Sequence, residues 1–220
     1  MRTSYHPEAP VGDVTPSDYR GLVKRIVIAG GIGAGKSAIS DRLRTLGYSV
    51  IDADDVAHQV TAKGSPTLQT LVDAFGSAVL ADDGALDRAF VAEIVFNDPS
   101  ALRRLNRITH GQIGLELVRQ LDEATGDAVF VAVPLYRPEM RAGFAIDEVW
   151  AVQVEPETAG RRLVEGRGFK EEDARARLAS QMSNEERSEI VDRVIWNEGT
   201  RDELFTQLDD ALELVGLAHG

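Results

Sequence analysis

The 220-residue chain is predicted to form an α/β fold built on a doubly wound, parallel five-stranded sheet. Five short apolar runs have the length and composition of buried parallel strands, and longer stretches with helical periodicity separate them. The strands are expected at residues 25–29, 48–51, 128–133, 148–154 and 191–196. With 43% hydrophobic residues, the chain can form one such domain with an inserted lobe, but it is too short for two full-sized domains.

A glycine-rich loop follows the first strand and precedes the first helical stretch. Its sequence, Gly30-Gly31-Ile32-Gly33-Ala34-Gly35-Lys36-Ser37, fits the pattern G-x-x-x-x-G-K-[ST]. Glycines keep side chains off such a loop, so that backbone N–H groups point at an anion near a helix N-terminus. The loop predicts a nucleoside triphosphate site, with Lys36 on the β- and γ-phosphates and the Ser37 hydroxyl as an Mg²⁺ ligand. A turn with an incidental Lys-Ser pair is disfavoured, because spacing, strand and helix agree.

The first helix is expected directly after this loop. Ile39, Leu43 and Leu46 recur at helical spacing and give one apolar face. Gly47 is expected to end the helix as a C-cap. Residues 30–47 thus form the first crossover between parallel strands.

Charge and composition restrict the partners. A formal net charge of -12 argues against a nucleic-acid-binding surface, so a phosphate site must be a local cluster of Lys and Arg. The absence of cysteine excludes disulfides, thiolate catalysis and Cys-ligated zinc, and fits a reducing compartment. Because the apolar runs are shorter than a membrane span, a soluble, cytoplasmic protein with no membrane partner is expected.

Residues 1–24 are expected to be a flexible extension of the domain at residues 25–220. They contain Pro7, Pro10 and Pro16 among polar residues, and they lack the apolar core of a signal peptide. We expect no strand or phosphate contact in this segment.

The interval between the second and third strands is unusually long and helical in pattern. Within it, residues 76–84 are rich in turn-forming types and are expected to connect two helices. Residues 57–125 are therefore expected to be a helical substrate lobe inserted into the nucleotide-binding core. A purely structural helical cap is the alternative.

One helix of this interval has a clear start. Asp98 and Pro99 are typical of an N-cap followed by the first helical residue. Leu102, Leu105 and Ile108 are then expected to lie on one apolar face.

Three predicted strands end in residues suited to a binding site. They are followed by the glycine-rich loop, by Asp52-Ala53-Asp54 and by Pro134-Leu135. In an open α/β sheet, ligands bind beyond the carboxyl ends of the strands, near the switch in strand order. The three strand ends should therefore converge on one crevice.

Asp54 is the residue of the second strand end that we expect to react. A carboxylate facing the γ-phosphate can accept the proton of an attacking hydroxyl or orient Mg²⁺. The alternative makes one of these acidic residues the N-cap of the next helix, with Asp55 as a favourable charge in its first turn.

A lid is expected at residues 160–182. Arg167 stands between two glycines, so it can swing on a mobile loop and neutralise charge on a transferring phosphoryl group. A solvated arginine favoured by the helix dipole is the alternative, and Arg162 is the competing lid residue. The charged stretch at residues 171–182 is expected to be a solvated helix face rather than a binding site.

Other polar residues carry weaker signals. His58 and His110 fall on predicted helices without the neighbours of a metal site, which favours packing or surface roles. Asn197 follows the last strand, where a turn could line the nucleotide base; a simple strand-ending turn is the alternative.

Several classes of phosphate-loop protein are excluded by missing motifs. The chain has no N-K-x-D string to read guanine, no strand ending in adjacent Asp-Glu, and no L-S-G-G-Q signature. A small-molecule kinase remains.

The ordered motifs resemble those of the dephospho-coenzyme A kinase family, from about residue 25 to residue 200. The matching strings are the phosphate loop, Val50-Ile51-Asp52-Ala53-Asp54, Asp83-Gly84-Ala85-Leu86-Asp87-Arg88, Leu105-Asn106, His110, Val133-Pro134-Leu135, the arginine-bearing lid, Ala179-Ser180-Gln181 and Val194-Ile195-Trp196-Asn197.

The resemblance implies a P-loop kinase with a nucleotide-binding core, a helical coenzyme A lobe and a lid, using ATP and Mg²⁺. ATP would donate its γ-phosphoryl group to the ribose 3′-hydroxyl of dephospho-coenzyme A. Asp54 matches the proposed general base, Lys36 the phosphate-loop lysine and Arg167 the lid arginine. The expected ATP contacts are Gly31, Ile32, Gly33, Ala34, Gly35, Lys36, Ser37, Ala38 and Asn197, and the expected metal ligands are Ser37 and Asp54. The expected acceptor contacts are Asp52, His58, Arg88, His110, Pro134 and Leu135.

The chain departs from the family pattern on the acceptor side. Tyr136-Arg137-Pro138 follows Pro134-Leu135, which displaces the acidic Glu139, and His58 and Gly111 replace the usual residues. A divergent kinase of another nucleotide or small hydroxyl compound therefore stays open as an alternative. A non-catalytic nucleotide-binding regulator is disfavoured, because the loop, Asp54 and Arg167 all persist.

Overall fold

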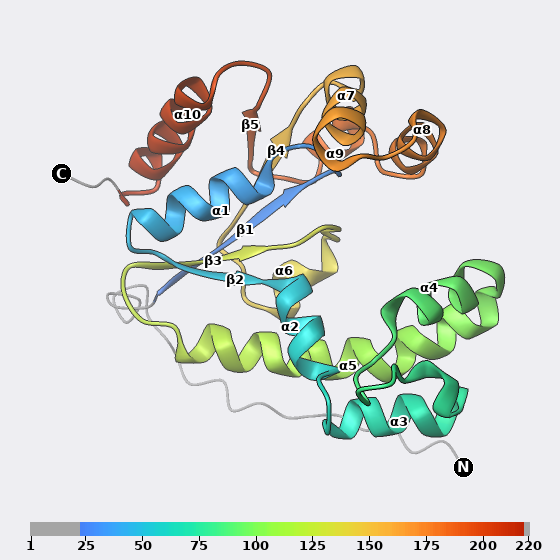
Figure 1. Ribbon diagram of the computed structural model, residues 1–220. Helices are drawn as coiled ribbons and strands as arrows, with labels where there is room; N and C mark the ends of the chain where they lie inside the picture. Colours follow the sequence, from blue (N-terminus) through green and yellow to red (C-terminus); the bar gives the residue numbers. More distant parts are fainter. Residues whose placement is uncertain (1–22, 218–220) are drawn as a thin grey trace, which may run out of the picture.

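The computed structural model describes residues 23–217 as five strands and the helices that cover them (Figure 1). The strands form one parallel sheet in the order β2-β3-β1-β4-β5. They are β1 (Lys24–Gly30), β2 (Ser49–Asp52), β3 (Ala128–Ala132), β4 (Glu148–Gln153) and β5 (Arg193–Trp196). This confirms the predicted fold class. Of the predicted extension, residues 1–22 lie outside the described residues, and Lys24 already belongs to β1.

The last strand begins two residues later than predicted. Asp192 closes the preceding turn instead: its backbone N–H donates to the carbonyl of Val149 at 2.9 Å, and its carboxylate accepts from the N–H of the same residue at 2.8 Å. Arg141 also donates to this carboxylate at 2.8 Å. The Asp192 carboxylate thus takes the place of a backbone hydrogen-bond acceptor just before β5 begins.

The sheet is covered on both faces, as the doubly wound pattern requires. Ile26 and Ile28 of β1 pack on the side of α1 (Lys36–Thr45) and α10 (Arg201–Leu214). Val27 and Ala29 pack on the side of α2 (Ala53–Val60) and α5 (Pro99–Glu123). Figure 1 shows these helix pairs on opposite faces. Because successive side chains of a strand point to opposite faces, the buried part of β1 at residues 26–29 is apolar on both faces.

The interval between β2 and β3 is helical. Besides α2 and α5, it contains α3 (Pro66–Phe75), η2 (Ser77–Val79) and α4 (Arg88–Asn97). Asp98 caps α5, since its carboxylate accepts from the N–H of Ser100 at 2.7 Å, and Pro99 is the first helical residue, as predicted. The role of this segment as a substrate lobe stays a prediction.

Of the predicted apolar face of α5, Leu105 and Ile108 are half-buried, but Leu102 is exposed. Leu102 is 41% exposed, whereas Ala101 and Thr109 are buried and Leu105 is half-buried. The residues facing inward therefore follow the i, i+4 row of the helix rather than its i, i+3 row.

The expected lid contains two helices, α7 (Pro156–Arg167) and α8 (Glu171–Ala179), and α9 (Asn184–Ser188) follows them in the chain; the short α6 (Glu139–Gly143) comes earlier. The prediction that Arg167 lies on a loop is wrong, because it is the last residue of α7. Gly168, with φ 67°, ends the helix in the left-handed conformation. In Figure 1, the α7–α8 pair and the α3–α4 pair lie on either side of the end of β3.

Candidate active site

One crevice of about 330 Å³ lies at the carboxyl ends of β1, β2 and β3. It is lined by the glycine-rich loop together with Lys36, Ser37, Ser40, Asp52, Asp54, Ala132, Val133, Pro134, Arg167 and Gln181. The predicted convergence of the three strand ends is therefore confirmed. We call this cavity the phosphate crevice.

The glycine-rich loop has little room for side chains. Gly35 has φ 99°, and a Cβ there would lie 2.1 Å from Nδ2 of Asn197. Gly33 has φ 76°, and its Cβ would lie 3.3 Å from Cα of Ala159. Gly35 is also the N-cap of α1 and has no side chain to cap it. The first N–H groups of α1 thus point into the crevice without side-chain competition, which suits an anion.

Lys36 crosses beneath the loop. Its Nζ donates to the carbonyl of Gly30 at 2.7 Å. Burial is the main cause that lowers the pKa of Lys36; Asp54 opposes this shift, while Arg187 and Arg167 reinforce it. An anion placed among these cations would favour the charged form of Lys36.

Asp52 and Asp54 have different structural positions. The Asp52 carboxylate accepts from the N–H of Asp54 at 2.9 Å and is the N-cap of α2. Asp54, in the first turn, is exposed and faces the crevice. The predicted alternative, that one of the acidic residues caps the helix, holds for Asp52. Asp54 is not the cap, so its carboxylate can take part in a reaction at the crevice.

A metal ion would depend on few protein oxygens here. Within residues 23–217, His, Cys, Asp and Glu form no group of three or more that could hold a metal. Ser37 and Asp54 line the same crevice, and hydroxyl and carboxylate oxygens suit Mg²⁺, which is usually held by one or two protein groups plus phosphates. The residues present therefore fit Mg²⁺ delivered with a nucleotide.

Asn197 lies beneath the loop rather than in the crevice. Its buried side chain donates from Nδ2 to the carbonyl of Ala34 at 2.8 Å, and its own carbonyl accepts from Arg162 at 2.8 Å. The predicted contact with a nucleotide base has no support in this placement. Ala34 and Ala38 also do not line the crevice.

The residues expected on the acceptor side are scattered. Asp52 and Pro134 line the phosphate crevice, and Leu135 lines a neighbouring cavity of about 250 Å³. His58 and His110 are exposed on α2 and α5, and Arg88 donates to Oγ1 of Thr61 at 2.8 Å. The last three positions do not line the crevice.

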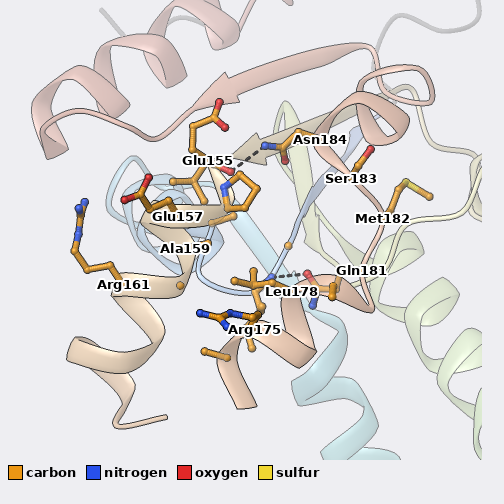
Figure 2. A pocket seen from close by; sticks show the side chains of 18 of the residues that line it. Glu155, Glu157, Ala159, Arg161, Arg175, Leu178, Gln181, Met182, Ser183 and Asn184 are labelled. Carbon is orange, nitrogen blue, oxygen red and sulfur yellow. Dashed lines mark hydrogen bonds between the residues drawn. The ribbon is translucent and has the colours of Figure 1, made fainter. Parts of the chain in front are cut away.

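A larger cavity of about 890 Å³ lies between α7, α8 and the segment before α9 (Figure 2). It reaches the glycine-rich loop at Gly31, Ile32 and Ala34, and we call it the lid cavity. Ala174 and Leu178 of α8 line it, so the expectation that this helix is only a solvated face is incomplete.

Two site residues were missed by sequence reasoning. Gln181 lines both the phosphate crevice and the lid cavity. It belongs to the string Ala179-Ser180-Gln181, which matches the family, but nothing in that string indicates its role. Arg187 is 9% exposed, and its guanidinium donates to Asn184 Oδ1 at 3.1 Å and to the Met182 carbonyl at 2.8 Å, both uncharged acceptors. Burial lowers the pKa of Arg187. Its surroundings in the sequence are polar, so no local pattern predicts its burial.

None of the helices formed within the described part of the chain is long and apolar enough to cross a bilayer.

Comparison with known proteins assigns the chain to a family. The family model described as dephospho-CoA kinase matches residues 25–203. A dephospho-CoA kinase of Streptomyces avermitilis is 43% identical over 197 residues, which cover 89% of this chain and 96% of that protein. A solved structure from Thermus thermophilus superposes with a TM-score of 0.74 at 29% identity, over 88% of this chain and 98% of that one. For a dephospho-CoA kinase structure from Campylobacter jejuni, which shares the fold, the TM-score is 0.61 at 24% identity, with 88% and 98% covered. The chain therefore belongs to the dephospho-coenzyme A kinase family.

Proposed function

We propose that the protein transfers the γ-phosphoryl group of ATP to the ribose 3′-hydroxyl of dephospho-coenzyme A, giving ADP and coenzyme A. The observation that carries this proposal is the phosphate crevice, which brings together Lys36, Asp54 and Arg167 from three separate segments. In a member of this kinase family, that set supplies phosphate binding, proton transfer and charge stabilisation.

The donor phosphates would bind along the glycine-rich loop and the N-terminus of α1. The N–H groups of that first turn and the Lys36 ammonium would neutralise charge on the β- and γ-phosphates. Asn197 would act indirectly, because its bond to the Ala34 carbonyl holds the shape of the loop.

Asp54 would act as the general base. As the 3′-oxygen attacks the γ-phosphorus, the proton of the hydroxyl passes to the Asp54 carboxylate. The bond between the γ-phosphorus and the bridging oxygen breaks, and ADP leaves with the electron pair. Asp52 would orient Asp54 through the cap of α2.

Ser37 and Asp54 would hold Mg²⁺, which supplies charge neutralisation to the phosphates when bound. Arg167, at the end of α7, would place its guanidinium on the transferring phosphoryl group when the lid closes.

The acceptor would lie between the crevice and the helical segment at residues 57–125. Asp52 and Pro134 would contact its reacting end, while His58, Arg88, His110 and Leu135 would lie farther along. The cytoplasmic location stays a prediction from the sequence.

A product assay tests the proposal. Purified protein with Mg²⁺-ATP and dephospho-coenzyme A should yield coenzyme A, identified by mass spectrometry as a 3′-phosphorylated product. Asp54→Asn is the negative control. Return of unchanged dephospho-coenzyme A, with turnover of another hydroxyl compound from a panel of acceptors, would favour the divergent kinase instead.

A further inference from the structure

Gln181 lies where three cavities meet. Its side chain lines the phosphate crevice, the lid cavity and the smaller cavity beside Tyr136. Its amide oxygen accepts a 2.9 Å hydrogen bond from the backbone N–H of Ile32, dashed in Figure 2. A Cβ at Gly31 would lie 2.8 Å from the same oxygen. The lid segment thus touches the phosphate loop through the Gln181 side chain, and the loop accommodates this contact with a glycine.

The hydrogen bond to Gln181 occupies the backbone N–H of Ile32, a donor that a bound phosphate would use. Inward-pointing N–H groups of a glycine-rich loop are anion ligands, and the amide oxygen of Gln181 has the position that a phosphate oxygen would take on Ile32. The Nε2 group of the same amide has no hydrogen-bond partner among the residues the structure describes. Gln181 is exposed and lines the crevice with Lys36 and Arg167, so this donor is accessible to a ligand there.

The backbone that carries Gln181 is held in place from the other side. Buried Arg187 donates to the Met182 carbonyl at 2.8 Å. Asn184 donates to the Val154 carbonyl at 2.9 Å, and Gln153 donates to the Asn184 carbonyl at 3.0 Å. These bonds tie the segment after α8 to the end of β4. Gln181 is therefore presented to the loop from a fixed base, as a preorganised ligand requires.

We propose that Gln181 is a ligand of the terminal phosphoryl group of ATP, and that its amide changes from acceptor to donor when the nucleotide binds. Rotation of the side chain moves Oε1 off Ile32, a phosphate oxygen takes the vacated position, and Nε2–H₂ donates to that oxygen from the side. The last side-chain torsion is soft and the others have alternative staggered states, so the backbone need not move. One phosphate oxygen then accepts from both Ile32 and Gln181. The proposal rests on ATP being the phosphoryl donor, as in the proposed function.

Two substitutions separate the acceptor and donor roles. Gln181→Glu keeps an acceptor for Ile32, but it cannot donate and it repels phosphate. Gln181→Met keeps the length of the side chain and has neither an N–H donor nor a carbonyl. By titration calorimetry without acceptor, we expect the glutamate variant to weaken ATP binding about tenfold or more and the methionine variant about threefold. ADP binding should change less than twofold in both.

A matched control accounts for charge. Gln69→Glu adds the same charge on α3, where Gln69 is exposed and bonded to Asp73, and it should leave ATP binding unchanged. Amide NMR gives a second readout: the Ile32 resonance of nucleotide-free protein should shift in Gln181→Met and not in Gln69→Glu.

Equal losses in the glutamate and methionine variants, equal losses for ATP and ADP, or wild-type affinity in both would overturn the assignment. The experiment omits the acceptor, so it is independent of which hydroxyl compound is phosphorylated. If ATP binds and the variants behave as expected while dephospho-coenzyme A is not converted, the acceptor assignment fails and the role of Gln181 stands.

Discussion

The side-chain amide of Asn197, at the end of β5, donates a 2.8 Å hydrogen bond to the carbonyl of Ala34 in the phosphate loop. The two residues are 163 positions apart in the chain, and the bond is buried. It ties the loop after the central strand to the edge strand of the sheet. The loop thus takes its shape partly from a residue that does not face the crevice.

Asn197→Ala should reveal this support. The substitution leaves the Ala34 carbonyl buried without its partner, so we expect a loss of about 1–3 kcal/mol in the free energy of unfolding. ATP affinity should fall as well. Chemical denaturation and calorimetry measure the two effects. Asn97→Ala is the control, because the Asn97 side chain donates to the Glu93 carbonyl at the exposed end of α4; equal effects in both variants would contradict a special role for Asn197.

Lys36→Ala should weaken ATP binding by about 10- to 100-fold, because it removes a charged donor from the β- and γ-phosphates. Nucleotide titration measures the effect. An unchanged dissociation constant would show that the N–H groups of the loop suffice.

The lowered pKa of Lys36 predicts a pH dependence. Burial is its main cause, so the ammonium of the free protein loses its proton below the ordinary lysine value of 10.5. ATP binds best to the charged form, and affinity is therefore full below the lowered pKa. As pH rises through it, affinity should fall, approaching about tenfold per pH unit. Lys36→Met should show no such slope, and a slope that persists in this variant would assign the titration to another group.

Asp54→Asn should reduce kcat by about 10²- to 10⁴-fold with little change in acceptor affinity, since the amide keeps the shape but cannot take up a proton. Steady-state kinetics separate kcat from KM. Asp55→Asn is a matched control, because Asp55 is exposed in the same helix turn and does not line the crevice. Near-normal turnover in Asp54→Asn would move the proton to another acceptor.

Arg167→Ala should lower kcat by about 10²- to 10³-fold and change the dissociation constant of ATP much less, because its contact with the phosphoryl group forms in the closed complex. Arg167→Lys should restore only part of the rate, since a point charge does not reproduce the planar fork. Kinetics and nucleotide titration together test this expectation.

The control for the lid is Arg175→Ala, which removes an exposed arginine paired with Glu171. Arg162 bonds to the Asn197 carbonyl, so Arg162→Ala is expected to affect stability more than turnover. Loss of turnover in Arg162→Ala with a nearly silent Arg167→Ala would transfer the lid role to Arg162.

Much of the framework was predictable because its signals are local. Five apolar runs predicted the strands, and the spacing of the glycines, Lys36 and Ser37 predicted a phosphate loop between strand and helix. The cap at Asp98 followed from two adjacent residue types. Each of these features depends on neighbours within a few positions.

The remaining features depend on tertiary contacts that no short pattern carries. Arg187 is buried because the segment after α8 packs against the loop, although its own neighbours in sequence are polar. Asn197 turns beneath the loop, not toward a base, because the Ala34 carbonyl lies within reach. Leu102 is exposed because the packing of α5 selects the row through Ala101 and Thr109.

The bonds of Asn184 to Val154 and to Gln153 have an evolutionary consequence. The chain leaves β4 for α7 at Pro156 and returns to the same strand end at Asn184. Both ends of the segment 156–184 are therefore anchored at the end of β4. A stretch anchored in this way can be lengthened, shortened or exchanged between relatives without altering the register of the sheet. Changes of length in the predicted lid, residues 160–182, would therefore disturb the sheet less than changes in the strands and the phosphate loop.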